Sequence, residues 1–496
     1  MFNNMRFFAA LLGLTLCITA CQESKEEKSA RLAKETCSSC HKFPDPSLLD
    51  KKTWKEGVLP EMGYRLGIGD RFQLMTRISE EQYQSAMAMD IYPLDPKISE
   101  EDWQSIVDYY VNNAPEKPIP QKKRSTISTS TLHFKEETLI SKKDPLGVVI
   151  SLRIEPTKGE VWAGTRNRTL WVLDSKKQIK RTVETNSPVA LTQMLAGTPY
   201  LLAIGKMYPN DEKIGTMYSI NPQGKLLAQI DSLKRPVDVQ ISDFNGDGVQ
   251  DFVICEYGFE RGQLTWVDGK NKTRHVLKAQ AGARNVVIKD YTGDGKPDLL
   301  VLMAQSREGV SLFINKGQGI FVEKPLLQFD SVFGSSYMEV ADMNQDGHDD
   351  IIVSNGDNAD YSRSKKAFHG VHVYLNDGRN NFKEGYFYPS YGASKTVARD
   401  FDQDGDLDLA MIAFFAENDQ GRNENFLYFQ NQGNMTFQVS NLNIGNGGHY
   451  ICMDAGDVDQ DGDIDIVLGN YQFGAVKPGT QLTPGLQLTY FKNLIR

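Results

Sequence analysis

Five short segments of the chain repeat one arrangement of oxygen-bearing side chains. Each has Asp at its first position, Asp, Asn or Thr at the third, Asp at the fifth, Gly at the sixth and Asp at the ninth. Side chains at positions 1, 3, 5 and 9 can surround one hard cation, and the glycine permits the sharp turn that such a loop needs. Because oxygen ligands favour Ca²⁺, we expect up to five calcium ions. The predicted ligands are Asp243, Asn245, Asp247, Asp251, Asp290, Thr292, Asp294, Asp298, Asp342, Asn344, Asp346, Asp350, Asp400, Asp402, Asp404, Asp408, Asp457, Asp459, Asp461 and Asp465.

The residues that follow each loop predict strands and exclude a helix-loop-helix calcium site. A site of that kind has a bidentate Glu at position 12, whereas position 12 is apolar here. Each loop continues into a short apolar, β-rich segment such as Phe252-Val253-Ile254, so the loops join strands. Position 12 is occupied by Ile254, Val301, Val353, Met411 and Leu468.

The loops recur at intervals of 47, 52, 58 and 57 residues, the period of a four-stranded propeller blade or another large β repeat. A single loop of this type is equally well explained as a solvated Asp/Gly turn, but five in register favour the repeat. From about residue 230 to residue 496 the sequence resembles the FG-GAP/VCBS repeats of integrin-α-like β-propellers. This resemblance implies a mainly β fold with calcium-binding loops between strands.

The sequence before residue 230 lacks the aspartates but keeps the strand pattern. Residues 160–164 and 170–174 are predicted to form paired strands, as are residues 200–204 and 217–220. Two further blades without ions are therefore expected. Divided among seven blades, residues 132–496 give about 52 residues per blade. We predict a seven-bladed β-propeller over this range.

The ends of the propeller sequence predict how the ring closes. In the later repeats the outermost strand begins with Phe-x₄-apolar, but the last repeat ends at residues 488–493 without such a strand. The same spacing occurs at Phe134 and Leu139, ahead of the first blade. We predict that residues 133–140 pair with residues 488–493 and supply the missing outer strand. The repeated pattern lies at Phe321 and Leu326, Phe382 and Phe387, and Phe437 and Leu442.

A second chemical motif, Cys37-Ser38-Ser39-Cys40-His41, lies near the N-terminus. Two thiols about one helical turn apart can form thioethers with the two haem vinyl groups, and the adjacent imidazole can bind the iron. A redox Cys-x-x-Cys would accompany a βαβ pattern, and a zinc site would need a further Cys or His pair nearby. Cys255 and Cys452 lie far away in the repeats. We therefore predict one covalent haem c.

The residues around this motif, 29–115, resemble a small monohaem cytochrome c domain. Residues 29–40 are predicted to form its first helix, and residues 99–110 have the capping Ser and the apolar period of its last helix. Met62 is the predicted sixth iron ligand opposite His41, because a Met thioether raises the haem potential as a relay carrier requires. The alternatives are Met75, Met87 and Met89.

The first residues predict export. One cation, Arg6, precedes an apolar run that is too short to span a bilayer and has the form of a signal peptide. The following Ile-Thr-Ala-Cys resembles a bacterial lipobox, which implies an acylated Cys21 and a stable membrane anchor. Gln22 after this cysteine favours the outer membrane by analogy with other lipoproteins. The predicted segments are a signal peptide over 1–20 and a lipidated tether over 21–28.

A linker over residues 116–131 joins the two predicted domains. It is rich in Pro at its start, continues with the basic Lys122-Lys123-Arg124 and ends in a Ser/Thr run. Because prolines stiffen a linker, we expect the haem domain to stand at a distance from the propeller. The basic triplet is expected to be solvated or, alternatively, to dock an acidic redox partner.

The formal net charge of the chain is −9. Seventeen of the predicted calcium ligands are Asp, and without ions these carboxylates would repel one another, so chelation should destabilise the propeller. An acidic chain without a basic stripe gives no reason to expect nucleic-acid binding.

No nucleophile elbow, paired-His metal site or phosphate loop is found, so no catalytic residue is predicted. We predict a one-electron carrier whose propeller docks a redox protein partner or binds a glycan or protein ligand. The alternative is a cytochrome-linked dehydrogenase that oxidises a sugar or alcohol in the propeller channel and passes electrons to its own haem. Polar residues at the starts of inner strands would line the channel mouth, unless they are scattered surface groups. These are Arg235, Arg284, Lys395, His449 and Tyr450.

Overall fold

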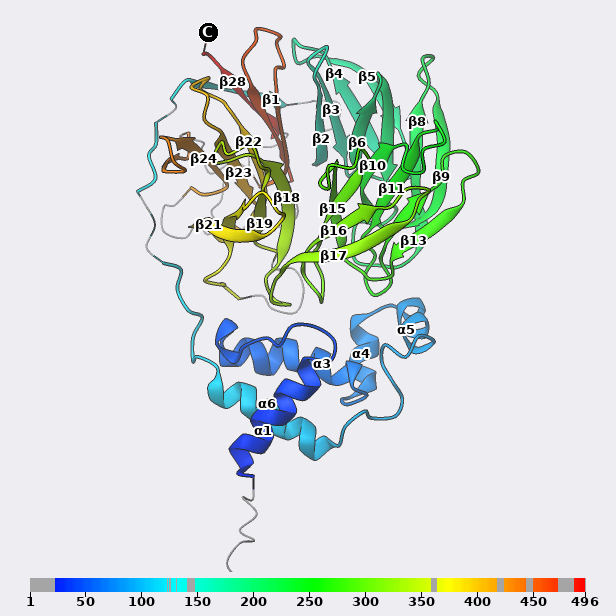
Figure 1. The fold of residues 1–496 in the computed structure, drawn as a ribbon, viewed down its shortest axis with the longest axis vertical. Coiled ribbons are helices and arrows are strands. Elements are labelled where there is room, and N and C mark those ends of the chain that lie inside the picture. Colours follow the sequence, from blue (N-terminus) through cyan, green and yellow to red (C-terminus); the bar gives the residue numbers. More distant parts are fainter. Residues whose placement is uncertain are drawn as a thin grey trace, which may run out of the picture.

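The computed structural model describes residues 23–122, 124, 126–130, 132–140, 148–357, 364–416, 423–442, 449–471 and 486–495. A small helical domain is followed along the chain by a large β-domain, and the two lie at opposite ends of the molecule (Figure 1). The predicted signal peptide and Cys21 lie outside the described residues. Of the helices in the described ranges, none combines the length and the apolar character that crossing a membrane requires.

The β-domain consists of seven four-stranded antiparallel sheets, which confirms the predicted seven-bladed propeller. Blade by blade, from the innermost strand outwards, the strands are β2 Val149–Glu155, β3 Glu160–Thr165, β4 Thr169–Leu173 and β5 Ile179–Glu184; β6 Val189–Leu195, β7 Thr198–Ala203, β8 Lys213–Ile220 and β9 Leu226–Lys234; β10 Pro236–Ser242, β11 Asp251–Glu256, β12 Gln263–Val267 and β13 Arg274–Lys278; β14 Ala283–Lys289, β15 Asp298–Met303, β16 Gly309–Asn315 and β17 Phe321–Gln328; β18 Ser335–Ala341, β19 Asp350–Asn355, β20 Gly370–Asn376 and β21 Phe382–Pro389; β22 Ala393–Arg399, β23 Asp408–Ala413, β24 Phe426–Asn431 and β25 Phe437–Ser440; and β26 Tyr450–Gly456, β27 Asp465–Asn470, β28 Leu486–Asn493 and β1 Phe134–Ile140.

The apolar runs that follow the aspartate loops are the second strands of their blades. Every residue of β11, β15, β19, β23 and β27 is buried, because both faces of these strands lie against neighbouring blades. The innermost strands contact one another around the whole circle, from β2 to β26 and back to β2. The two blades without aspartate loops are present, and their predicted strand pairs are confirmed as β3 with β4 and β7 with β8.

The ring closes as the sequence predicts. Strand β1 pairs antiparallel with β28, with Phe134 opposite Asn493 and Leu139 opposite Leu488. The Phe134 side chain is 4% exposed and lies with its ring centroid 5.3 Å from that of Tyr428 and 6.3 Å from that of Phe491. Backbone pairing and a buried aromatic side chain together join the two ends of the propeller sequence.

The helical domain has six α-helices. Its first helix begins earlier than predicted, because Ser24 and Glu27 form a capping box, and it ends at Cys37 and not at Cys40. Ser38 is the C-cap, and its backbone amide donates to the carbonyl oxygen of Lys34 at 3.1 Å. The Ser39 hydroxyl donates to the carbonyl oxygen of Thr36 at 2.6 Å. The predicted last helix is confirmed, with Ser99 as its N-cap. The elements are α1 Lys25–Cys37, the 3₁₀ turn η1 Pro46–Leu48, α2 Lys51–Thr53, the π-helical turn η2 Trp54–Val58, α3 Leu59–Arg65, α4 Arg71–Arg77, α5 Glu80–Met87 and α6 Glu100–Asn113.

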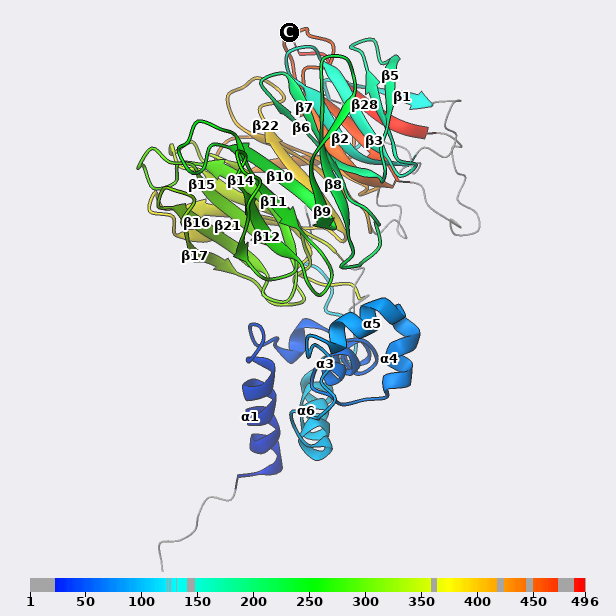
Figure 2. The same ribbon diagram turned by 90° about the vertical axis from the view of Figure 1, so that its right-hand side faces the viewer.

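The linker does not hold the helical domain at a distance, so that prediction is wrong. The two domains are in contact, with the helices against one end of the propeller (Figure 2). The linker itself is fastened to the propeller. The backbone amide of Ser128 donates to the carbonyl oxygen of Val439 at 2.9 Å, and Arg124 is nearly buried in an ion pair with Glu424. Arg124 is therefore neither solvated nor available to a partner.

The aspartate loops and the helical domain lie on opposite faces of the propeller. In a four-stranded antiparallel blade, the turns after the first and third strands share one face, and the turns after the second strand share the other face with the connections between blades. The aspartate loops follow first strands. The residues that touch the helical domain, including Glu260, Arg307 and Asp330, follow second strands or lie between blades.

Candidate functional site

The Cys37-x-x-Cys40-His41 motif forms the turn that ends α1. Cys37 packs against the apolar cluster of the helical domain, which includes Trp54 and Tyr110, whereas Cys40 is exposed. Both thiols are free, and burial raises the pKa of Cys37 to about 11. A redox-active Cys-x-x-Cys depends on a lowered thiol pKa. The surroundings of Cys37 therefore argue against that alternative.

The neighbouring imidazole has one nitrogen available for a ligand. His41 Nδ1 lies 2.9 Å from the backbone carbonyl oxygen of Lys42. A carbonyl oxygen can only accept, so Nδ1 carries the proton and Nε2 presents its lone pair, as in metal-binding histidines. Burial lowers the pKa of His41, which favours the neutral ring. Two free thiols beside a neutral imidazole with an available Nε2 fit a covalently attached haem.

Met62 lies on α3 and packs against the same apolar cluster as Cys37. Met75 and Met89 are 49% and 46% exposed, and Met87 packs against a different cluster, around Leu74. The structure therefore favours Met62 over the other three methionines for the sixth ligand position, although ligation itself stays a prediction.

Replacing Met62 by Ala should remove the Met-to-iron charge-transfer band near the red end of the visible spectrum. It should also lower the haem potential by on the order of 0.1 V, since axial ligands set haem potentials over roughly 0.8 V. Optical spectra and a redox titration measure both effects. A Met62→His variant separates ligation from packing, because it should stay six-coordinate without the band. The control, Met75→Ala, should keep the band; a band that survives in Met62→Ala excludes Met62.

The first and ninth aspartates shape each loop through backbone hydrogen bonds. Asp243 accepts from the amides of Gly246 and Gly248 at 2.7 and 2.8 Å. The glycine at position 6 has φ between +81° and +98° in all five loops, the left-handed region that favours glycine. Asp251 at position 9 is buried and accepts from Phe244 within the loop and from Gly269 after the third strand. The ninth aspartate thus fastens the loop to the neighbouring turn, as do Asp298, Asp350, Asp408 and Asp465.

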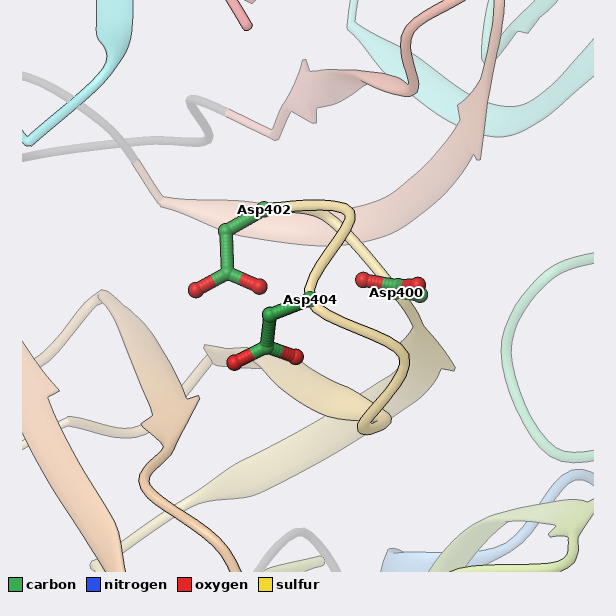
Figure 3. Close-up of side chains that lie close together, drawn as sticks. All are labelled: Asp400, Asp402 and Asp404. Atoms are coloured by element: carbon green, nitrogen blue, oxygen red, sulfur yellow. The ribbon is translucent and has the colours of Figure 1, made fainter.

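Carboxylates converge most clearly in the fourth and fifth loops. One oxygen each from Asp400, Asp402 and Asp404 lie within 4.8 Å of one another (Figure 3), and the same holds for Asp457, Asp459 and Asp465. In the fourth loop a buried oxygen of Asp400 and one of Asp402 have no hydrogen-bond partner. Buried carboxylate oxygens of this kind fit a divalent cation. The first three loops have Asn or Thr at position 3, and cation binding by all five loops stays a prediction.

Sequence reasoning missed one acidic residue of the fifth loop. Asp463, at position 7, is 1% exposed, and neither of its carboxylate oxygens has a hydrogen-bond partner. It lies within 4.8 Å of Asp459 and Asp461, and burial raises its pKa to about 7. The sequence feature that could have identified it is an acidic residue at position 7, where the first three loops have Val, Lys or His. Asp406, its equivalent in the fourth loop, instead accepts from the side chain of Gln345 at 2.7 Å.

The polar residues predicted for the channel mouth are largely used within the protein. Arg235 donates to the carbonyl oxygen of Gly258 at 3.1 Å, the Lys395 ammonium lies 4.7 Å from the ring centre of Tyr337, and the Tyr450 hydroxyl bonds to Thr489. Arg284 lies on β14, and the backbone amide of His449 donates to Asn470. In the described part of the chain, two cavities lie away from these residues. One, of about 550 Å³, lies between α5 and residues 206–212, and one of about 270 Å³ lies beside Leu59 and Trp103.

The aspartate loops coincide with a known repeat. The model of the FG-GAP-like repeat matches residues 243–301, 290–353 and 400–468, so each match begins at the first aspartate of a loop and all five loops are included. Integrin alpha-V of Gallus gallus is 29% identical over 207 residues, which are 36% of this chain and 20% of the integrin chain. The chain thus spans only a fifth of this relative.

Solved structures match part of the chain at low sequence identity. The Pan2 WD40 domain of Neurospora crassa matches with a TM-score of 0.46 and 10% identity over 75% of this chain and 97% of its own. A chain from the complex of BBS1N with ARL6DN matches with a TM-score of 0.45 and 9% identity over 73% and 97%. The repeats and the blade count together identify the chain as a seven-bladed β-propeller with FG-GAP-like repeats, similar in them to integrin alpha-V, and preceded by a helical domain.

Proposed function

We propose that this protein is an exported, lipid-anchored c-type cytochrome that transfers one electron at a time. The observation that carries the proposal is the turn after α1. There, the free thiols of Cys37 and Cys40 flank a two-residue turn. The Nδ1 atom of His41 donates to the Lys42 carbonyl oxygen, which leaves Nε2 as the nitrogen that can bind iron. The helical domain is the proposed cytochrome c domain, and the propeller is its calcium-stabilised platform for a redox protein partner or another protein or glycan ligand.

In this proposal a covalent haem supplies the one-electron chemistry, and the residues of the chain set its position and surroundings. Cys37 and Cys40 hold it by thioethers, while the hydrogen bond from His41 to the Lys42 carbonyl orients the imidazole. Met62 packs against the apolar cluster of the same domain. The apolar cluster around Trp54 and Tyr110 would exclude water from the apolar part of the haem.

A lipid anchor on Cys21 would orient the two domains relative to the membrane. Helix α1 begins at Lys25, only four residues after Cys21, so the tether is shorter than predicted from sequence. The N-terminal end of α1 points away from the propeller in both views (Figures 1 and 2). A lipid on Cys21 would therefore hold the helical domain near the membrane, with the aspartate-loop face of the propeller farthest from it.

A redox titration of the full-length chain tests the proposal. Protein from a host that matures c-type cytochromes should contain one haem per chain and titrate in a single transition with n = 1. The same chain from a host without this maturation should lack the haem absorbance and keep the propeller's melting transition. Absence of haem in the first sample would refute the proposal. If a sugar or alcohol with a quinone cofactor reduces the haem without a protein donor, the protein is a cytochrome-linked dehydrogenase and not only an electron carrier.

A further inference from the structure

The propeller holds the helical domain through a preorganised acidic residue. Arg65 on α3 donates to both carboxylate oxygens of Glu260, at 2.9 and 2.7 Å, and the Tyr92 hydroxyl donates to the same group at 3.2 Å. The Glu260 turn is itself fixed, because the carboxylate of Asp211 accepts from the amides of Phe259, Glu260 and Arg261. A two-pronged Arg–carboxylate contact gives orientation as well as attraction, so the docking is geometrically specific.

Apolar side chains of the propeller complete the core of the helical domain. Val332 and Phe368 pack in the same cluster as Trp54 and Tyr110, and Val332 is only 8% exposed. This is the cluster against which Cys37 and Met62 lie. The helical domain therefore does not bury its core alone, and the propeller forms part of the wall around the proposed haem site.

Two charged contacts reach the Cys-x-x-Cys-His turn itself. The Arg307 guanidinium donates through Nε to the backbone carbonyl oxygen of Cys40 at 2.7 Å. On the other side of His41, the Lys42 ammonium lies 3.1 Å from a carboxylate oxygen of Asp330. The residues immediately before and after the proposed iron ligand are thus both held by side chains of the propeller, one cationic and one anionic.

We propose that the propeller is a constituent of the redox centre, in which Arg307 and Asp330 set the haem potential with opposite signs. This inference rests on the proposed function, because it requires a haem held by Cys37, Cys40 and His41. Reduction adds one negative charge at the iron. A fixed cation beside the turn stabilises the reduced state, and a fixed anion stabilises the oxidised state. Arg307 and Asp330 are positioning residues in this scheme and need not touch the haem.

Charge-neutralising variants test the proposal through the haem potential. Arg307→Gln should lower the equilibrium constant for haem reduction about threefold, which is roughly 28 mV at 59 mV per tenfold for one electron. Asp330→Asn should change the potential by a similar amount in the opposite direction. Titrations at low ionic strength give the largest effect, because both residues are partly or fully exposed to salt. Opposite signs distinguish electrostatics from loosened docking, which would move both variants in the same direction.

Two further variants complete the design. Arg379→Gln removes the same charge from an exposed position on the aspartate-loop face and should leave the potential unchanged. Arg307→Lys keeps the charge and should restore most of the wild-type potential. If haem is attached but Arg307→Gln and Asp330→Asn titrate like the wild type, or shift in the same direction, this inference fails while the cytochrome assignment stands. If no haem is attached to the wild-type chain, the proposed function itself fails.

Discussion

Replacing both Cys37 and Cys40 by Ala should abolish covalent haem and leave the propeller folded. Each thiol is expected to form one thioether, so the single variants should each retain a weakened attachment through the other cysteine. The propeller should melt as in the wild type, because its neighbouring blades bury apolar clusters against one another. The mass of the denatured chain and haem staining after denaturing electrophoresis measure attachment directly. Non-covalent haem is lost in both assays.

The matched control for this experiment is Cys255→Ala. Cys255 is fully buried in β11 and lies in no Cys-x-x-Cys-His sequence. This variant should keep its covalent haem even if the propeller is destabilised by the lost side-chain volume. Haem that remains on the double variant would place the attachment outside the turn after α1 and would remove the main support for the proposed function.

Local patterns predicted the parts of the fold that repeat. The ring closure could be predicted because Phe134 and Leu139 repeat a spacing present in three other outer strands. The end of α1 could not, because the sequence immediately after Cys37 has no Gly or Pro to stop a helix, and the turn at Ser38 and Ser39 is set by hydrogen bonds that are visible only in the folded chain. Asp463 was missed for a related reason: only the folded structure shows that its carboxylate is buried close to those of Asp459 and Asp461 and not turned outward.

Side-chain contacts that join the linker and the helical domain to the propeller could not be predicted from the sequence. Arg124 was placed in a solvated triplet, yet its partner Glu424 lies 300 positions further along the chain. Arg65 and Glu260 are 195 positions apart, and nothing in either local sequence marks them as a pair. The prolines of the linker predicted stiffness, but stiffness does not determine whether the two domains touch. The predicted haem residues therefore lie on an interface that the sequence did not reveal.

Removing divalent cations with excess EGTA should lower the melting temperature of the propeller by on the order of 10 °C or more. An ion held at a hundredfold excess over its Kd stabilises the native state by about 2.7 kcal/mol. Each kcal/mol corresponds to roughly 2–4 °C for domains of 150–250 residues and somewhat less for a larger one. Several ions are predicted, and carboxylates such as Asp400, Asp402 and Asp404 repel one another without a cation between them. Calorimetry with added calcium and with EGTA measures the difference.

A loop variant and a surface variant show whether the loops cause this effect. Asp404→Ala should reduce the gap between the two melting temperatures, because it removes the carboxylate at position 5, where all five loops have Asp, and so weakens one site without changing the others. The control, Asp231→Asn, removes a charge from an exposed position on β9, away from any loop, and should leave the gap unchanged. Equal melting temperatures with calcium and with EGTA in the wild type would mean that the loops hold no stabilising ion.

The stabilisation by calcium should also depend on pH. It is measured on protein that has been stripped of calcium at neutral pH, with and without added calcium, because EGTA itself binds calcium poorly when it is protonated. In the metal-free chain, burial raises the pKa of Asp408 to about 7 and that of Asp465 to about 6, compared with about 4 in an unfolded chain. Between roughly pH 4 and pH 7 the native state thus binds protons that the unfolded state has released, so metal-free stability falls as the pH rises. Calcium needs the ionised carboxylates and competes with these protons. The gap in melting temperature should therefore be small near pH 5 and widest above pH 7, and a gap that stays constant over this range would show that these two aspartates are not calcium ligands.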